Sequence, residues 1–294
     1  MKRNPLSIIR VIPLFILGGI LLLSGCEDVI DVDAPSEPPR LSVDALIRID
    51  EDEALTTAVV NVSLTSSFFG DTETAELEQI IIQNEDYEPM GALDSNFMVL
   101  TETEPGRYEG LNGTGFFTEG TLQLVITYEG SRYVAFTEYA PAVPIDTLMQ
   151  GEGNLFTGDE TEVLVSFTDD ADRDDYYLFD FDFGEYLVTE DEFYQGQTFE
   201  FSYFYDEGVE SGRIIDIELL GVTESFYNYM NQLIVQAGGD QGPFQTPSAT
   251  VRGNIINVTN IDNIDSFDNV DDRNNFALGY FAVCQTFSKS ITIE

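Results

Sequence analysis

The chain has 294 residues, of which 54 are acidic and 12 basic; it contains two cysteines and neither histidine nor tryptophan. A net charge of −42 repels phosphate backbones and therefore argues against nucleic-acid binding. Without histidine, Ser-His-Asp catalysis, Cys-His catalysis and histidine-containing metal sites are excluded. Paired carboxylates serve glycosidases, but no spacing singles out one pair among so many acidic residues. We therefore expect that the protein is not an enzyme.

Residues 1–25 have the parts of a secretion signal. Basic residues near the start precede an apolar run from Val11 to Leu23, and small residues stand directly before Cys26. The run is shorter than the about 20 residues that a transmembrane helix needs. Leu23-Ser24-Gly25-Cys26 resembles the bacterial lipobox, in which the cysteine is acylated. We expect a lipid on Cys26, which would anchor the chain to a membrane; the alternative is an ordinary cleaved signal with an incidental cysteine.

Residues 26–40 are acidic and then rich in proline, as expected of an extended tether. Cleavage before Cys26 would remove three basic residues and change the net charge from −42 to −45. Glu27 and Asp28 resemble the acidic surface-export signals of Bacteroidota lipoproteins. This resemblance implies an outer-membrane protein on the cell surface; the alternative is a soluble tether that faces the periplasm.

Two prolines, Pro141 and Pro144, divide the rest of the chain into two parts with strand-like alternation. Residues 41–143 are predicted to form a β-sandwich of immunoglobulin or transthyretin type, because many short alternating runs are separated by turn signals. Residues 148–294 are predicted to form a second β-rich domain. The fold class is therefore mostly β.

One segment of the second part breaks the alternation. Between about 223 and 237, apolar residues recur at three- and four-residue steps, with Thr223 as a possible N-cap and Gly238-Gly239 as a stop. We predict one amphipathic helix there. Cys284 lies in an apolar run and is predicted to be a buried, inert thiol.

Two acidic stretches have the oxygen-rich composition of calcium loops. Asp170, Asp172 and Asp174 have the opening spacing of an EF-hand loop, but its required glycine and glutamate positions hold Asp175 and Phe181. A looser calcium site therefore competes with a solvated turn, which the sequence favours. The same alternatives apply to a second stretch: Asp262, Asp265, Asp268, Asp271 and Asp272. Apart from this calcium, no cofactor is expected.

Several short motifs occur in a fixed order along the mature chain: Pro144-Ile145-Asp146-Thr147-Leu148, Asp174-Asp175-Tyr176-Tyr177, Phe226-Tyr227-Asn228-Tyr229, Gly253-Asn254-Ile255-Ile256-Asn257 and Ala277-Leu278-Gly279-Tyr280-Phe281. In this order they resemble a domain-of-unknown-function family of Bacteroidota outer-membrane lipoproteins, typically encoded beside TonB-dependent transporters. The resemblance implies a lipid-anchored binding or accessory module whose partner is such a transporter. The alternative is a structural or adhesive surface protein with calcium-stabilised acidic loops. We expect the aromatic-rich second part, around Phe179 and Phe201, to make the main partner contact.

Overall fold

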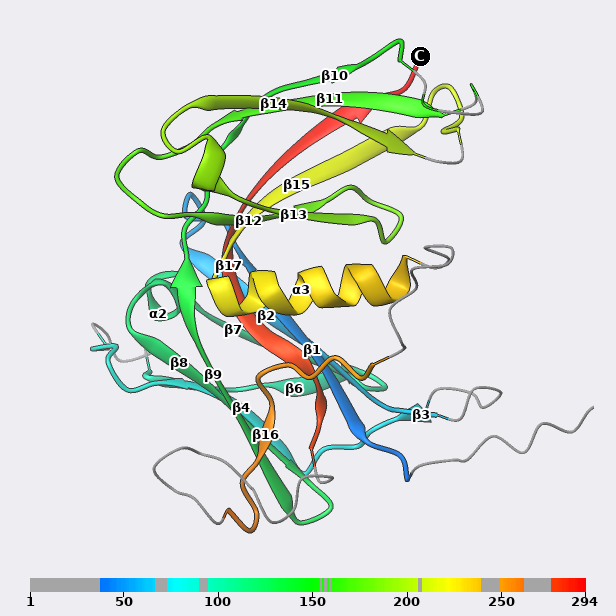
Figure 1. Cartoon of the computed structure of the whole chain (residues 1–294). Helices are drawn as coiled ribbons and strands as arrows, with labels where there is room; N and C mark the ends of the chain where they lie inside the picture. Colours follow the sequence, from blue (N-terminus) through cyan, green and yellow to red (C-terminus); the bar gives the residue numbers. More distant parts are fainter. Residues whose placement is uncertain are drawn as a thin grey trace, which may run out of the picture. The chain divides into compact units, whose positions relative to one another are not determined.

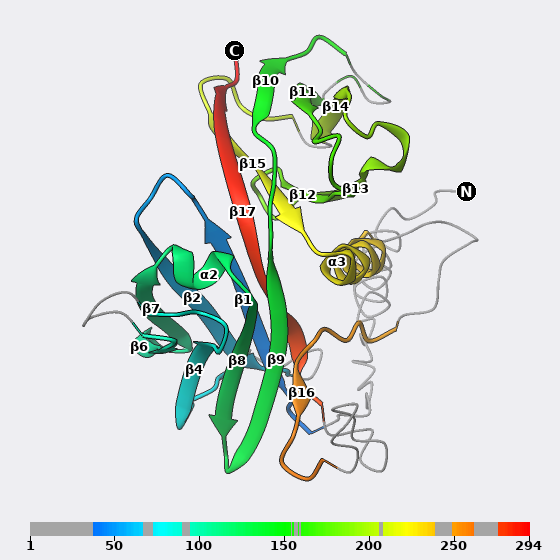
Figure 2. The same ribbon diagram turned by 90° about the vertical axis from the view of Figure 1, so that its left-hand side faces the viewer.

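Strands dominate the computed structural model, which confirms the predicted mostly-β class. It describes residues 38–294 except 67–72, 90–94, 154, 156–157, 159, 206–207, 239–248 and 262–275. Cys26 and the second acidic stretch lie outside the described residues. Residues Pro38–Glu294 form one compact unit (Figures 1 and 2). No helix among the described residues is long and apolar enough to cross a membrane.

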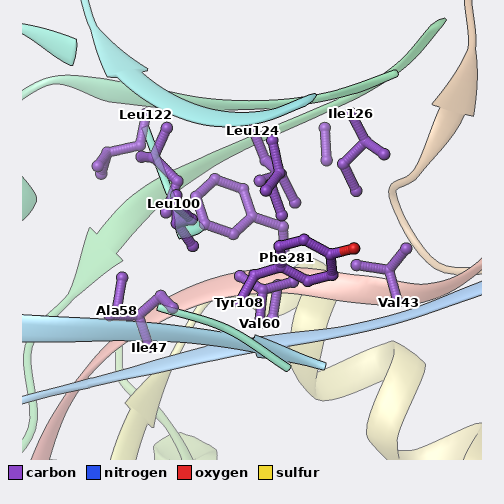
Figure 3. Close-up of a cluster of buried hydrophobic side chains, with 14 of the residues drawn as sticks. Val43, Ile47, Ala58, Val60, Leu100, Tyr108, Leu122, Leu124, Ile126 and Phe281 are labelled. Carbon is purple, nitrogen blue, oxygen red and sulfur yellow. The ribbon is translucent and has the colours of Figure 1, made fainter. Parts of the chain in front are cut away.

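The first core lies between two layers of strands. Its elements are β1 (Leu41–Ile49), β2 (Leu55–Leu64), β3 (Glu73–Thr74), β4 (Gln79–Asn84), β5 (Phe97–Val99), β6 (Thr101–Glu104), β7 (Arg107–Gly113), the short helix α2 (Gly115–Thr118), β8 (Thr121–Tyr128) and β9 (Ser131–Ala140). Every second residue of β1, β2 and β8 is buried, as alternation requires. Figure 3 shows side chains of β8 facing those of β1, β2 and the last strand: Leu122, Leu124, Ile126, Val43, Val60 and Phe281.

The sheet around this core bends back on itself. Its strand order is β5-β4-β8-β9-β17-β1-β2-β7-β6, so β5 and β6 are its two ends. Only Leu100 separates these two strands in the chain, and its N–H donates to the Ile80 carbonyl at 3.0 Å. The segment 97–104 thus passes from one layer to the other and closes the sheet around the core.

The second core lies between a separate three-stranded sheet and an extension of the large one. Its elements are β10 (Ile145–Gln150), β11 (Thr161–Thr168), β12 (Tyr176–Asp180), β13 (Tyr186–Glu190), the 3-10 turn η2 (Asp191–Phe193), β14 (Thr198–Tyr205) and β15 (Ile214–Val222). The three-stranded sheet has the order β10-β11-β14, and β12 pairs with both β13 and β15. Aromatic rings fill much of this core, including Phe167, Tyr177, Phe179 and Phe181.

The last strand, β17 (Leu278–Thr292), belongs to both cores (Figure 2). Residues 278–285 pair in parallel with β1, and residues 286–292 pair antiparallel with β15. Phe281 is buried in the first core, whereas Phe287 packs against the second. The first sandwich is therefore not built from residues 41–143 alone, because the end of the chain supplies one of its strands.

Helix α3 (Glu224–Ala237) confirms the predicted amphipathic helix. The Thr223 hydroxyl accepts a hydrogen bond from the Phe226 N–H at 3.3 Å, so this residue is the N-cap. Phe226 and Tyr229 pack with Tyr280 of β17 in a third, smaller cluster beneath the helix. The remaining element, β16 (Ile256–Asn257), pairs with β9. Figure 1 shows α3 crossing in front of β17.

Candidate functional site

The three aspartates of the candidate calcium loop do not converge on a common point. One Asp170 oxygen accepts from the Asp172 N–H at 3.1 Å, and the other lies 3.3 Å from Arg173 Nε. Asp174 Oδ1 instead accepts from Gln195 Nε2 at 3.1 Å. Among the residues that the structure describes, no group of three acidic or cysteine side chains is arranged to hold a metal. The Asp170 and Asp174 carboxylates are therefore engaged by the protein itself.

Carboxylates flanking that loop form a buried polar cluster that the sequence analysis did not identify. Tyr177 Oη lies 2.6 Å from Asp169 Oδ1 and 3.0 Å from Asp175 Oδ2. Arg173 Nη2 donates to Asp175 Oδ2 at 3.1 Å, and Asp191 Oδ2 accepts from the Asp175 N–H at 2.7 Å. These hydrogen bonds connect the loop that follows β11 with strand β12 and with η2. Each buried carboxylate of the cluster therefore has a hydrogen-bond partner within the protein.

Burial changes the ionisation of this cluster. It raises the pKa of Asp175, although the Tyr177 hydrogen bond and the Arg173 guanidinium oppose that rise. Burial and the nearby Asp169 carboxylate also raise the pKa of Tyr177. Cys284, in the third cluster, is fully buried, and burial raises the pKa of its thiol to about 12. That thiol is therefore protonated at neutral pH, which makes it a poor nucleophile.

A row of aromatic side chains lies along β14, at one side of the second core. Phe199, Phe201 and Tyr203 are only partly buried there, whereas Phe179 on β12 is completely buried. Tyr194 stacks on Phe199 with ring centroids 4.5 Å apart. Its neighbour Phe193 is 84% exposed, more than any other large apolar side chain among the described residues. We call β14 together with Phe193, Phe199, Phe201 and Tyr203 the aromatic edge.

Side-chain hydrogen bonds tie the two sheets of the second sandwich together on both sides. On the β10 side, Lys289 Nζ of β17 donates to the carbonyls of Ile145 and Asp146 at 3.2 and 2.7 Å. On the β14 side, Tyr205 Oη donates to the Phe181 carbonyl at 2.8 Å, and Tyr203 Oη donates to the Glu185 carboxylate. Among the described strands, β14 pairs only with β11. The aromatic edge therefore lies at one end of the three-stranded sheet.

The sequence around the aromatic edge has an unusual charge. Residues 174–212 contain twelve acidic and thirteen aromatic residues, and neither lysine nor arginine. Glu192 and Glu200 are both exposed. Phe193 directly follows three acidic residues and has no alternating partner, so periodicity could not assign it to a core. The acidic neighbours and the missing alternation were the sequence features that could have indicated an exposed aromatic residue.

The other exposed apolar residues form weaker candidates for a contact surface. Phe97, Val99 and Phe136 lie on the outer face of β5 and β9, where β9 is paired on both sides and β5 has three residues. A recess of about 380 Å³ beside β1 and β2 is lined mainly by polar residues, among them Ser42, Asn61 and Arg107. Arg107 is paired with Glu109 at 2.7 Å. Within the part of the chain that the structure describes, only the aromatic edge combines a strongly exposed aromatic side chain, Phe193, with partly exposed ones on an eight-residue strand at the end of its sheet.

The chain is similar to a known protein family over most of its length. The family model described as "Domain of unknown function (DUF4249)" matches residues 27–290, a range that includes both sandwiches and the helix. No curated protein matches the chain.

Proposed function

We propose that this chain, which belongs to the DUF4249 family, is a non-catalytic, lipid-anchored binding module that contacts a partner protein through its aromatic edge. The observation that carries the proposal is Phe193, which is 84% exposed and directly precedes Tyr194, the residue that stacks on Phe199 of the edge strand β14. Covering an exposed aromatic side chain with a partner removes apolar surface from water, which is favourable, and aromatic residues are enriched at protein contacts.

The anchor and the location are supported by the sequence. The apolar run before Leu23-Ser24-Gly25-Cys26 and the acidic tether of residues 26–40 are the features of an exported lipoprotein. We place the protein at the outer membrane, on the cell surface. The family resemblance makes a TonB-dependent transporter the partner that we propose.

The anchor is tested by the substitution Cys26→Ser. We expect the variant to appear in the soluble fraction and to lose acyl labelling, because the lipid is the proposed attachment. A variant that stays uncleaved in the membrane would show that residues 1–25 are a transmembrane anchor instead.

The contact is tested by recovery of the partner from native membranes in mild detergent, with the full-length lipoprotein as bait. Phe193→Ser should lose the partner that the wild type recovers. Phe97→Ser is the matched control, because it makes the same change at an exposed phenylalanine of the first sandwich, 53% exposed. Loss of the partner with Phe97→Ser but not with Phe193→Ser would move the contact to the first sandwich and contradict the proposal.

The alternative, a structural or adhesive protein with calcium-stabilised loops, gains no support from the described residues. Asp170 and Asp174 are engaged by Arg173 and Gln195, respectively. We therefore propose the binding module alone.

A further inference from the structure

We infer that the aromatic edge binds an extended segment of the partner protein, with alternating basic and apolar residues, as an additional strand beside β14. This inference rests on the proposed function and specifies the chemistry of the partner. Its support comes from the backbone of β14, from the two faces of that strand, and from the surrounding charge.

The backbone of β14 can accept another strand. Its eight residues pair antiparallel with β11, in a continuous register from Thr161↔Tyr205 to Thr168↔Thr198. In such a pair, every second residue directs its N–H and C=O away from the partner strand. No described strand occupies that outer side of β14. Exposed edges of this kind bind extended peptides through main-chain hydrogen bonds.

The two faces of β14 differ, so the alternating side chains of an added strand would contact two different surfaces. Phe199, Phe201 and Tyr203 point toward the second core and remain partly exposed. Glu200 and Ser202 lie between them in the sequence, on the opposite face, and are exposed. An added strand continues both faces of the sheet. Its apolar residues would extend the aromatic row, and its basic residues would lie beside Glu200.

The acidic residues in this part of the chain favour a positively charged ligand. The segment 174–212, which lies between Arg173 and Arg213, contains twelve acidic and no basic residues, so its net charge attracts a cationic segment and repels an acidic one. A second copy of this chain is a poor occupant for the same reason, since the chain has a net charge of −42 and β14 itself contains Glu200. The occupant is therefore a basic segment of a different protein.

The test uses the mature lipoprotein in detergent and an octapeptide of alternating lysine and valine with blocked ends, titrated by calorimetry. Three further peptides are compared: one with all lysine amides N-methylated, one with all valine amides N-methylated, and one with glutamate in place of lysine. In strand addition only alternate N–H groups face β14. One N-methylation pattern should therefore abolish binding and the other leave it largely intact, while the glutamate peptide should not bind.

Protein variants locate the site. Glu200→Lys should weaken binding of the lysine peptide by about tenfold, because it reverses the charge beside the added strand. Glu138→Lys is the matched control, since Glu138 is an exposed glutamate on β9 of the first sandwich, and its effect should be much smaller.

The outcomes separate this inference from the proposed function. Equal effects of the two N-methylation patterns, or equal effects of Glu200→Lys and Glu138→Lys, would show attraction by overall charge and overturn strand addition. Absence of peptide binding would also overturn it. In each case recovery of the native partner through Phe193 could still hold. If Phe193→Ser recovers the native partner normally, the proposed function itself fails.

Discussion

The hydroxyl of Tyr177 has one proton but lies within hydrogen-bond distance of two buried carboxylates, those of Asp169 and Asp175. It donates fully to only one of them, and the shorter distance, 2.6 Å, is to Asp169. Asp175 keeps the Arg173 guanidinium at 3.1 Å, yet burial still raises its pKa. In the folded protein, proton uptake by Asp175 is therefore easier than in the unfolded chain.

This raised pKa has a defined consequence for stability. A carboxyl group whose folded pKa exceeds its unfolded value of 3.8 contributes stability below 3.8, and that contribution is lost as pH rises through the folded pKa. We predict that Asp175→Asn gains stability relative to the wild type when pH is raised from about 4 to about 7. Urea unfolding at both pH values measures this difference. The control is Asp174→Asn, the same change at an exposed neighbour. A constant difference for Asp175→Asn would contradict the prediction.

Among the elements, those with local sequence signals were predictable. The alternation of Leu41, Val43 and Ala45 identified β1 and its buried face, and the three- and four-residue steps after Thr223 identified α3. The partners of β17 were not predictable, because alternation shows which face is buried but not which distant strand lies alongside. The sequence suggested a partner contact around Phe179 and Phe201, but Phe179 is completely buried. The strongly exposed Phe193 was not identified from the sequence.

The N-cap of α3 provides a test at this scale. Thr223 accepts from the Phe226 N–H, one of the donors that has no partner within the helix. We predict that Thr223→Ala lowers the free energy of unfolding by about 1 kcal/mol. Thr223→Ser keeps a hydroxyl acceptor and should retain most of the stability. Urea unfolding of the three proteins measures the difference, and equal losses for both variants would show that the hydroxyl does not cap the helix.

For the whole molecule, the shared strand β17 predicts that both cores unfold together. Phe281 is completely buried in the first core, and the same strand pairs with β15 beside the second. We predict that Phe281→Ala lowers the free energy of unfolding by about 3–5 kcal/mol and that the transition stays single. Far-ultraviolet circular dichroism and labelling of the buried Cys284 thiol should report the same midpoint. Two separate transitions would show that the sandwiches unfold independently.

The charge of the whole molecule predicts how the stability of the fold depends on salt. At a net charge of −42, like charges repel one another more strongly in the compact state than in the expanded chain, so folding works against this repulsion. Because salt screens exposed charges, the urea midpoint should rise as sodium chloride increases from about 0.01 M to about 1 M.

A calcium titration distinguishes the screening of charge from binding at a specific site. We expect no saturable rise of the midpoint at micromolar calcium chloride in a sodium chloride background, since Asp170 and Asp174 are engaged by Arg173 and Gln195. A saturable rise that Asp172→Ala removes would show a calcium site in this loop and favour the structural alternative over the binding module.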